Sequence, residues 1–160
     1  MVTERHKREV AALGIASVAL VCAFAARGDV TKCDNCKAAP QSLRQCGVCH
    51  MIFPAKMLPQ RSWIAIISGL DNHFGERANI PQKDKARILA YLTSHAADGP
   101  NATALDRHFL SDVLPSATPL RITRTEWWNQ MHADFDFDGV KRSNVKSPAN
   151  CLACHVDGIE

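Results

Sequence analysis

The chain has 160 residues, of which 46% are hydrophobic and 22% are charged, and its formal net charge is +3. Because this small excess of positive charge forms no basic stripe, the composition argues against binding to nucleic acid. Only 6% of the residues are aromatic. No β-branched residues alternate along the chain, so the sequence disfavours an all-β fold and favours a mainly α-helical one.

The first part of the chain has the pattern of an export signal. A basic stretch that contains Arg5, Lys7 and Arg8 precedes an apolar run from Val10 to Ala26, and an Ala-Phe-Ala triplet near its end fits a signal-peptidase site. We therefore predict a signal peptide over residues 1–25 and a periplasmic mature protein. The apolar run also approaches the length of a membrane-spanning helix of about 20 residues, so an uncleaved anchor, which would attach the protein to the membrane, is the alternative.

Two short cysteine motifs indicate the chemistry of the chain. Residues 46–50 and residues 151–155 both follow the pattern C-x-x-C-H, which is typical of covalent haem c attachment. In this pattern both thiols bond to the porphyrin and the histidine that follows binds the iron. We therefore predict two covalently bound haem c groups, with Cys46, Cys49, Cys151 and Cys154 as attachment residues and His50 and His155 as proximal iron ligands.

A third cysteine pair lies upstream of the first motif. Cys33 and Cys36 form a C-x-x-C sequence that is followed by Lys37. In an oxidising compartment, a local disulfide or a pair of free thiols is the favoured interpretation. Two alternatives stay open, a redox-active dithiol and a third haem with the lysine amine as its iron ligand. A third haem would favour an enzyme.

Three helical stretches follow the first motif. After Pro59, apolar residues recur every three or four positions as far as Phe74, with Ser62 as the candidate cap. A second helix is expected from Pro81 to the Asp-Gly-Pro sequence at residues 98–100. A third begins at the capping-box sequence of residues 123–126 and carries apolar residues to position 135.

These elements predict a small helical c-type cytochrome, with short helices packed around the bound haems. The stretch from Asp98 to Thr103 has the composition of a linker. We therefore expect two haem-binding lobes, an N-terminal lobe over residues 26–98 and a C-terminal lobe over residues 99–160.

The remaining histidines are candidates for the sixth iron ligand. His73 and His132 both follow apolar residues at helical spacing, so each is expected on the buried face of a helix, toward a haem. We predict that they are the distal ligands and that both haems are low-spin and bis-histidine. His95 and His108 are the less favoured alternatives.

Two methionines offer a different sixth ligand, a thioether, which raises the reduction potential of a haem. Met57 lies in a loop bounded by prolines and close to the first motif, and we interpret it as a packing residue at the haem edge. Met131 adjoins His132 but points about one third of a turn away on a helix. The bis-histidine prediction is therefore retained.

The order of the motifs resembles the bacterial dihaem cytochrome c family. The segments that carry the resemblance are CGVCH, LPQRSW, GLDNHFGERA, YLTSHAAD, LRITRTEWWNQMH and ANCLACH. The resemblance covers nearly the whole mature chain and implies a periplasmic electron carrier, with His50 and His155 as proximal ligands and His73 and His132 as distal ligands. Sequence proximity favours pairing His73 with the His50 haem and His132 with the His155 haem.

The resemblance also implies redox partners, namely a small monohaem cytochrome as acceptor and a membrane b-type cytochrome as donor. Electron transfer is thus the predicted function, and no residue is assigned a catalytic role. The main alternative is a small haem enzyme, a peroxidase or a protein that reacts with oxygen or nitrogen oxides, in which one axial site is open or displaceable. A haem-based sensor or a subunit of a membrane complex is a third class, which a retained N-terminal anchor would favour.

Overall fold

The computed structural model describes residues 39–136, 145 and 147–155. The predicted signal peptide and the Cys33–Cys36 pair lie outside these residues, so both remain predictions. Within the described ranges no helix is long and apolar enough to cross a membrane.

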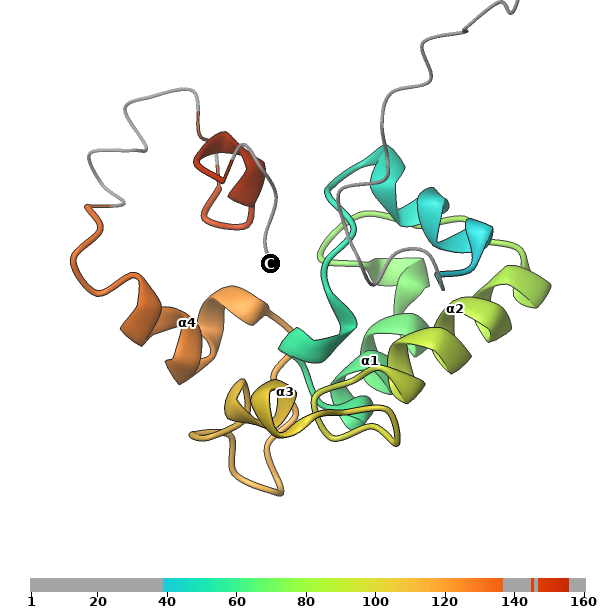
Figure 1. The fold of residues 1–160 in the computed structure, drawn as a ribbon. Coiled ribbons are helices and arrows are strands. Elements are labelled where there is room, and N and C mark those ends of the chain that lie inside the picture. Colours follow the sequence, from blue (N-terminus) through green and yellow to red (C-terminus); the bar gives the residue numbers. More distant parts are fainter. Residues whose placement is uncertain (1–38, 137–144, 146, 156–160) are drawn as a thin grey trace, which may run out of the picture.

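All regular elements of the described ranges are helical (Figure 1), which confirms the predicted fold class. Four are α-helices and most of the others are single 3-10 turns. In chain order they are η2 (Gln41–Val48), η3 (Ala55–Met57), α1 (Gln60–Ser68), η4 (Leu70–Asn72), α2 (Gln82–Ser94), α3 (Ala104–His108), η5 (Ile122–Arg124), α4 (Glu126–Met131) and η6 (Cys151–Ala153).

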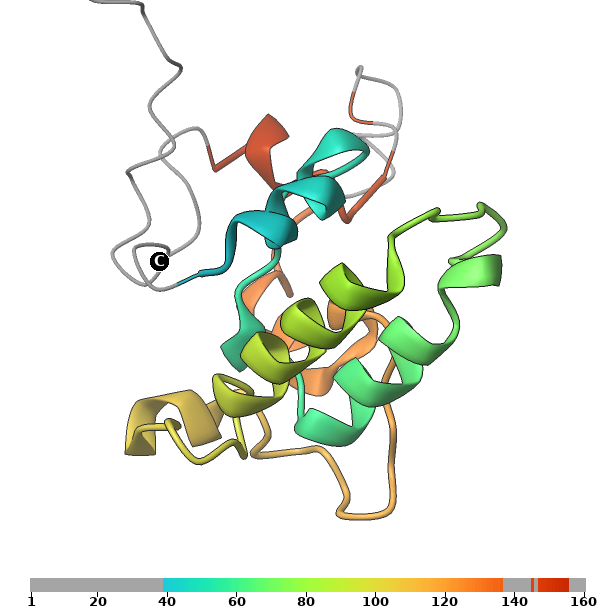
Figure 2. The same cartoon turned by 90° about the vertical axis from the view of Figure 1, so that its right-hand side faces the viewer.

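The hydrophobic core lies in the N-terminal half, where α1 and α2 pack side by side (Figures 1 and 2). Trp63 of α1 is buried, and its indole N–H donates a 2.7 Å hydrogen bond to the carbonyl of Ala55, so the ring packs without leaving its polar atom unpaired. The members of this core cluster all lie between the start of η2 and the residues just after α2: Leu43, Ala55, Leu58, Trp63, Ile67, Leu70, Ile88, Leu92 and Ala96.

The C-terminal half is built differently. Beyond Ala97, the described residues include no buried hydrophobic side chain. The helices there are short, and their N-termini are fixed by threonine caps: Thr103 forms a capping box with Asp106 at the start of α3, and Thr125 accepts a hydrogen bond from the Trp128 backbone N–H at the start of α4. Local hydrogen bonds and aromatic contacts, and not a packed core, therefore hold the described part of the C-terminal half together.

Polar contacts fix the segment after α2 against α1. The Asp98 carboxylate accepts a 2.7 Å hydrogen bond from the Gln60 backbone N–H, in the first turn of α1, and faces Arg61 at 3.4 Å. Arg61 also donates hydrogen bonds to the carbonyls of Leu114 and Ala117, at 3.1 and 2.6 Å. One arginine thus connects α1 to the chain that leads into the C-terminal half.

A glycine is required where this segment turns away from α2. A β-carbon at Gly99 would lie 2.5 Å from the carbonyl oxygen of Thr93 and 2.8 Å from that of Ser94, both of which belong to rigid backbone. The Asp-Gly-Pro sequence therefore marks a close approach of backbone to backbone. Whether the two lobes divide at this point remains a prediction.

Three details of the predicted helices are wrong. The first helix ends at Ser68, where Gly69 caps it, and does not reach Phe74; its N-cap is Pro59, while Ser62 lies buried inside the helix. The second helix ends at Ser94, one turn before the Asp-Gly-Pro sequence. The third is capped by Thr125, not by a residue-123 capping box, and it ends at Met131.

Candidate haem-binding sites

The first C-x-x-C-H motif lies at the end of η2 and just beyond it, next to the core. Burial raises the pKa of the Cys46 thiol, whereas Cys49 is exposed. One attachment sulfur thus lies in an apolar environment and the other at the surface. Ile52 and Phe53, just after the motif, pack against the core cluster, so the motif is anchored on both sides.

His50 is oriented by a hydrogen bond to the main chain. Its Nδ1 atom lies 2.6 Å from the Met51 carbonyl oxygen, which can only accept, so Nδ1 carries the proton. The other ring nitrogen, Nε2, is then free to bind a metal. Metal-binding histidines in proteins generally have this arrangement, because the hydrogen bond fixes both the tautomer and the ring plane.

The His73 ring lies opposite the His50 ring. The two centroids are 6.0 Å apart and the planes are inclined by 29°. Two metal–nitrogen bonds of about 2 Å, with about 1 Å more from each nitrogen to its ring centre, separate two axial imidazoles by about 6 Å. The distance between these rings therefore equals the span of two imidazoles bound to one metal ion.

His73 is presented by a tight turn, not by a helix. The backbone N–H of His73 donates to the carbonyl of Glu76, and the N–H of Glu76 donates back at 3.2 Å. The two residues between them both have positive φ, 56° at Phe74 and 102° at Gly75, as in a type I′ hairpin turn. The residue was predicted correctly as a candidate, but the helical face that was used to select it does not exist.

Burial lowers the pKa of the His73 imidazole, and the neighbouring His50 and Arg121 lower it further. A lowered pKa keeps the ring neutral at pH 7. Neutral imidazole is the form that binds a metal ion, because protonation removes the lone pair.

The second C-x-x-C-H motif forms η6 and the residue pair after it. Burial raises the pKa of the Cys151 thiol, while Cys154 is exposed, which repeats the division seen in the first motif. The backbone N–H of His155 donates a 2.8 Å hydrogen bond to the Cys151 carbonyl, so the motif forms one closed turn. His155 itself is exposed.

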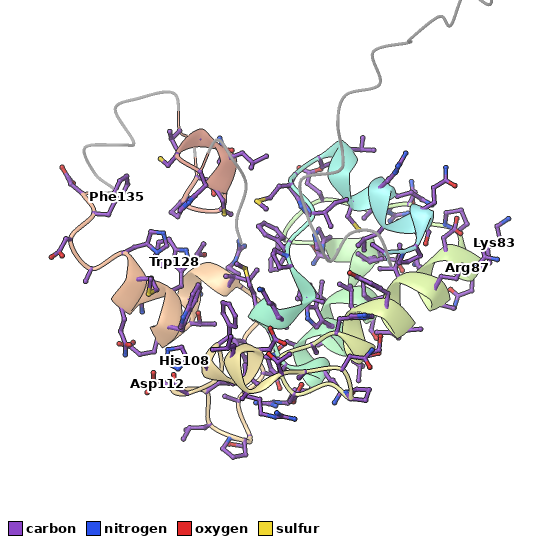
Figure 3. The ribbon with its side chains drawn as sticks, in the orientation of Figure 1. Lys83, Arg87, His108, Asp112, Trp128 and Phe135 are labelled. Atoms are coloured by element: carbon purple, nitrogen blue, oxygen red, sulfur yellow. The ribbon has the colours of Figure 1, made fainter. Side chains whose placement is uncertain are left out.

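The His132 ring lies opposite the His155 ring. The centroids are 6.2 Å apart, again the span of two axial imidazoles, but the planes are inclined by 78°. His132 Nδ1 lies 2.9 Å from the carbonyl oxygen of Trp128 on α4, and the two side chains stack at 4.4 Å. Trp128 is labelled in Figure 3.

The other candidate ligands lie elsewhere. His95 caps the end of α2, where its ring stacks on Tyr91 at 4.4 Å and its Nδ1 bonds to the Tyr91 carbonyl. His108, labelled in Figure 3, is exposed at the end of α3. Met57 is buried in η3, as expected of a packing residue, and Met131 is 65% exposed.

Sequence spacing alone could not predict the ring-to-ring distances. The backbone carbonyls that orient His50 and His132, and the arginine beside His73, also carried no sequence signal. A residue pair such as Phe74-Gly75 is a usable signal in retrospect, because a glycine at the second position is typical of a type I′ turn.

Comparisons with known proteins agree with the interpretation of the two C-x-x-C-H motifs as haem-attachment sites. The family model of the dihaem cytochromes c matches residues 42–159. A solved dihaem cytochrome c from Rhodobacter sphaeroides is 36% identical, with a TM-score of 0.66 over 74% of this chain and 92% of that one. A dihaem cytochrome c from Shewanella baltica is 31% identical, with a TM-score of 0.55 over 72% of this chain and 78% of that one.

None of the curated proteins compared with the chain gave a match. The family match nevertheless spans well over half of the sequence and includes both C-x-x-C-H motifs. The described cysteines and histidines also have the chemistry that two covalently bound haem c groups require. The chain belongs to the dihaem cytochrome c family.

Proposed function

We propose that the protein is a periplasmic electron carrier in which each haem iron is bound by two histidines, His50 with His73 and His155 with His132. The family implies electron transfer. The two opposed ring pairs, at 6.0 and 6.2 Å, carry the proposal that both axial positions of each iron are filled by imidazole. His73 and His132 each face the motif histidine that is nearer in sequence.

When bound, the haems would supply one-electron chemistry, because each iron can cycle between the ferric and ferrous states. The main chain of this protein would hold the histidine ligands still during that cycle. The Met51 and Trp128 carbonyls fix the planes of His50 and His132, and the turn at Phe74-Gly75 fixes His73. A rigid ligand set keeps the two oxidation states similar in geometry, which favours fast electron exchange.

Ligand saturation is what separates this proposal from a haem enzyme. A peroxidase or an oxygen-reacting protein needs one open or displaceable axial site beside an acid–base group. The two ring pairs have the spacing of two imidazoles bound to one metal ion, so under this proposal neither iron would have an open site. Catalysis then belongs to the redox partners, for which we propose a small monohaem cytochrome as acceptor and a membrane b-type cytochrome as donor.

The ligand assignment is tested by replacing each distal histidine. His73→Ala and His132→Ala should each convert one of the two haems from low-spin to high-spin and allow it to bind carbon monoxide. His95→Ala and His108→Ala are matched controls, which should leave both haems low-spin. Optical spectra with and without carbon monoxide provide the measurement.

Unchanged spectra in both distal variants would contradict the assignment. Carbon monoxide binding by the unmodified ferrous protein would show a displaceable ligand and would favour the enzyme alternative. The proposed compartment is tested separately, by N-terminal sequencing of the mature protein and by fractionation before and after a carbonate wash. Recovery only in carbonate-washed membranes would favour a retained anchor.

A further inference from the structure

An arginine from the C-terminal half reaches the ligand turn of the first site. The guanidinium carbon of Arg121 lies 4.0 Å from the ring centroid of Phe74, and that ring lies 4.8 Å from the ring of His73. The charge is close enough to His73 to lower its pKa. Arg121 therefore lies beside the position that a haem between His50 and His73 would occupy.

A pocket of about 330 Å³ adjoins this arginine. Its lining residues are three apolar ones and two arginines: Phe74, Pro119, Leu120, Arg121 and Arg124. Within the described part of the chain, neither arginine pairs with a carboxylate. Apolar walls with unpaired cations suit a ligand that has an apolar plate and an anionic edge, which is the character of a porphyrin with its propionates.

The conformation of Phe74 supports a role for this pocket. Its φ of 56° is uncommon for a large side chain and carries an energetic cost. The side chain is also 46% exposed, so burial in the protein does not repay that cost. The turn nevertheless places the ring between His73 and Arg121, where it would contact both the haem edge and the guanidinium.

We propose that Arg121, with Arg124, forms a carboxylate-binding site for a propionate of the haem attached at Cys46 and Cys49, and that it raises the reduction potential of that haem. The proposal rests on the ligation of this haem by His50 and His73. A guanidinium can bind a carboxylate through two parallel hydrogen bonds. It also favours the ferrous state, because reduction removes one positive charge from the iron centre.

The segment that carries both arginines, residues 119–124, leads directly into α4 and so toward His132. Arg121 thus joins the ligand turn of one haem to the helix that presents the ligand of the other. A single charge in this position changes the reduction potential of the first haem more than that of the second. The charge therefore separates the two reduction potentials.

The test is a redox titration of the holoprotein, monitored by electron paramagnetic resonance so that each haem is followed by its own ferric signal. Arg121→Gln should lower the reduction equilibrium constant of the His50 haem about tenfold, which is about 59 mV for one electron. Arg121→Lys should restore most of this loss because it keeps the charge. Arg87→Gln is the matched control, since Arg87 is an exposed arginine on α2 that faces Asp84 at 4.0 Å.

An unchanged potential in Arg121→Gln, or an equal shift in Arg87→Gln, would overturn the proposal. Loss of the low-spin signal of the His50 haem in Arg121→Gln, with the signal retained in Arg87→Gln, would also overturn the proposal. Arg121 would then support the ligand turn and would not bind a carboxylate. A crystal structure of the holoprotein gives an independent readout, with the guanidinium expected within hydrogen-bond distance of a propionate. A high-spin His50 haem in the unmodified protein would instead contradict the ligand assignment, whatever the arginine variants show.

Discussion

The two C-x-x-C-H motifs share both cysteines and the histidine, yet the structure supports them in different ways. The first lies against the hydrophobic core, and its histidine faces a half-buried partner whose ring plane is inclined by 29°. The second ends on an exposed histidine that faces a short helix, with ring planes inclined by 78°. The motif therefore determines the chemistry of haem attachment, whereas the packing around it determines the rigidity and orientation of the ligands.

The largest expected difference between the two halves is their dependence on haem. Cys151→Ser combined with Cys154→Ser should remove one haem and leave the α1–α2 half folded, because that half has its own core. Cys46→Ser combined with Cys49→Ser should remove the first haem. The C-terminal half should still depend on the second haem for its structure. Haem quantification and limited proteolysis provide the measurement.

In the first variant, proteolysis should be confined to the chain beyond α3, and one low-spin haem should remain. Equal protease sensitivity of both halves would show that the α1–α2 core does not fold without the second haem. That outcome would remove the proposed difference between the two regions.

A cavity in the core should be the next largest effect. Ile88 of α2 is fully buried, so Ile88→Ala should destabilise the holoprotein by about 2–5 kcal/mol through lost burial and a residual cavity. Leu114, in the C-terminal half, is 69% exposed, and Leu114→Ala should change stability by no more than about 0.5 kcal/mol. Denaturant unfolding followed by circular dichroism compares them, and similar losses in the two variants would contradict the account.

The sequence predicted some of this architecture well. Both C-x-x-C-H motifs, the α-helical class and the approximate positions of α1, α2 and α4 followed from local patterns, which is what such patterns encode. Helix ends were less accurate, since the apolar spacing up to Phe74 continues through a cap at Gly69 and a hairpin turn. The opposition of His73 to His50 depends on tertiary packing, and the Arg121–Phe74 contact joins residues 47 positions apart.

Helix capping offers a sharper comparison within the C-terminal half. The Thr125 hydroxyl donates to the Ile122 carbonyl at 2.8 Å and accepts from the Trp128 N–H at 3.3 Å. Thr125→Val should cost about 1 kcal/mol and loosen α4, so the His155 haem should become partly high-spin on warming before the His50 haem does. Variable-temperature optical spectra provide the measurement.

Thr103→Val is the control for this effect. Thr103 caps α3, whose only candidate ligand is the less favoured His108, so the variant should lose similar stability without any change in spin state. A high-spin fraction of the same size in both variants would mean that general loosening of the C-terminal half, and not α4 itself, controls the ligand.

The smallest expected effect concerns a polar group in the N-terminal core. The Ser62 hydroxyl is fully buried and has no hydrogen-bond partner in the described part of the chain. Ser62→Ala should therefore stabilise the protein by up to about 1 kcal/mol, whereas Ser68→Ala at the exposed end of α1 should be close to neutral. A clear fall in melting temperature for Ser62→Ala would show that this hydroxyl has a partner after all.

The central claim is that both irons are saturated by histidine, and it is tested most directly by low-temperature electron paramagnetic resonance and near-infrared magnetic circular dichroism of the ferric protein. Spins should be quantified against the haem content. The account predicts two low-spin, bis-nitrogenous haems with different signals, a rhombic one from the nearly parallel rings and one with a larger maximal g value from the nearly perpendicular rings. A high-spin haem, a thioether-ligated haem or a third haem would contradict it.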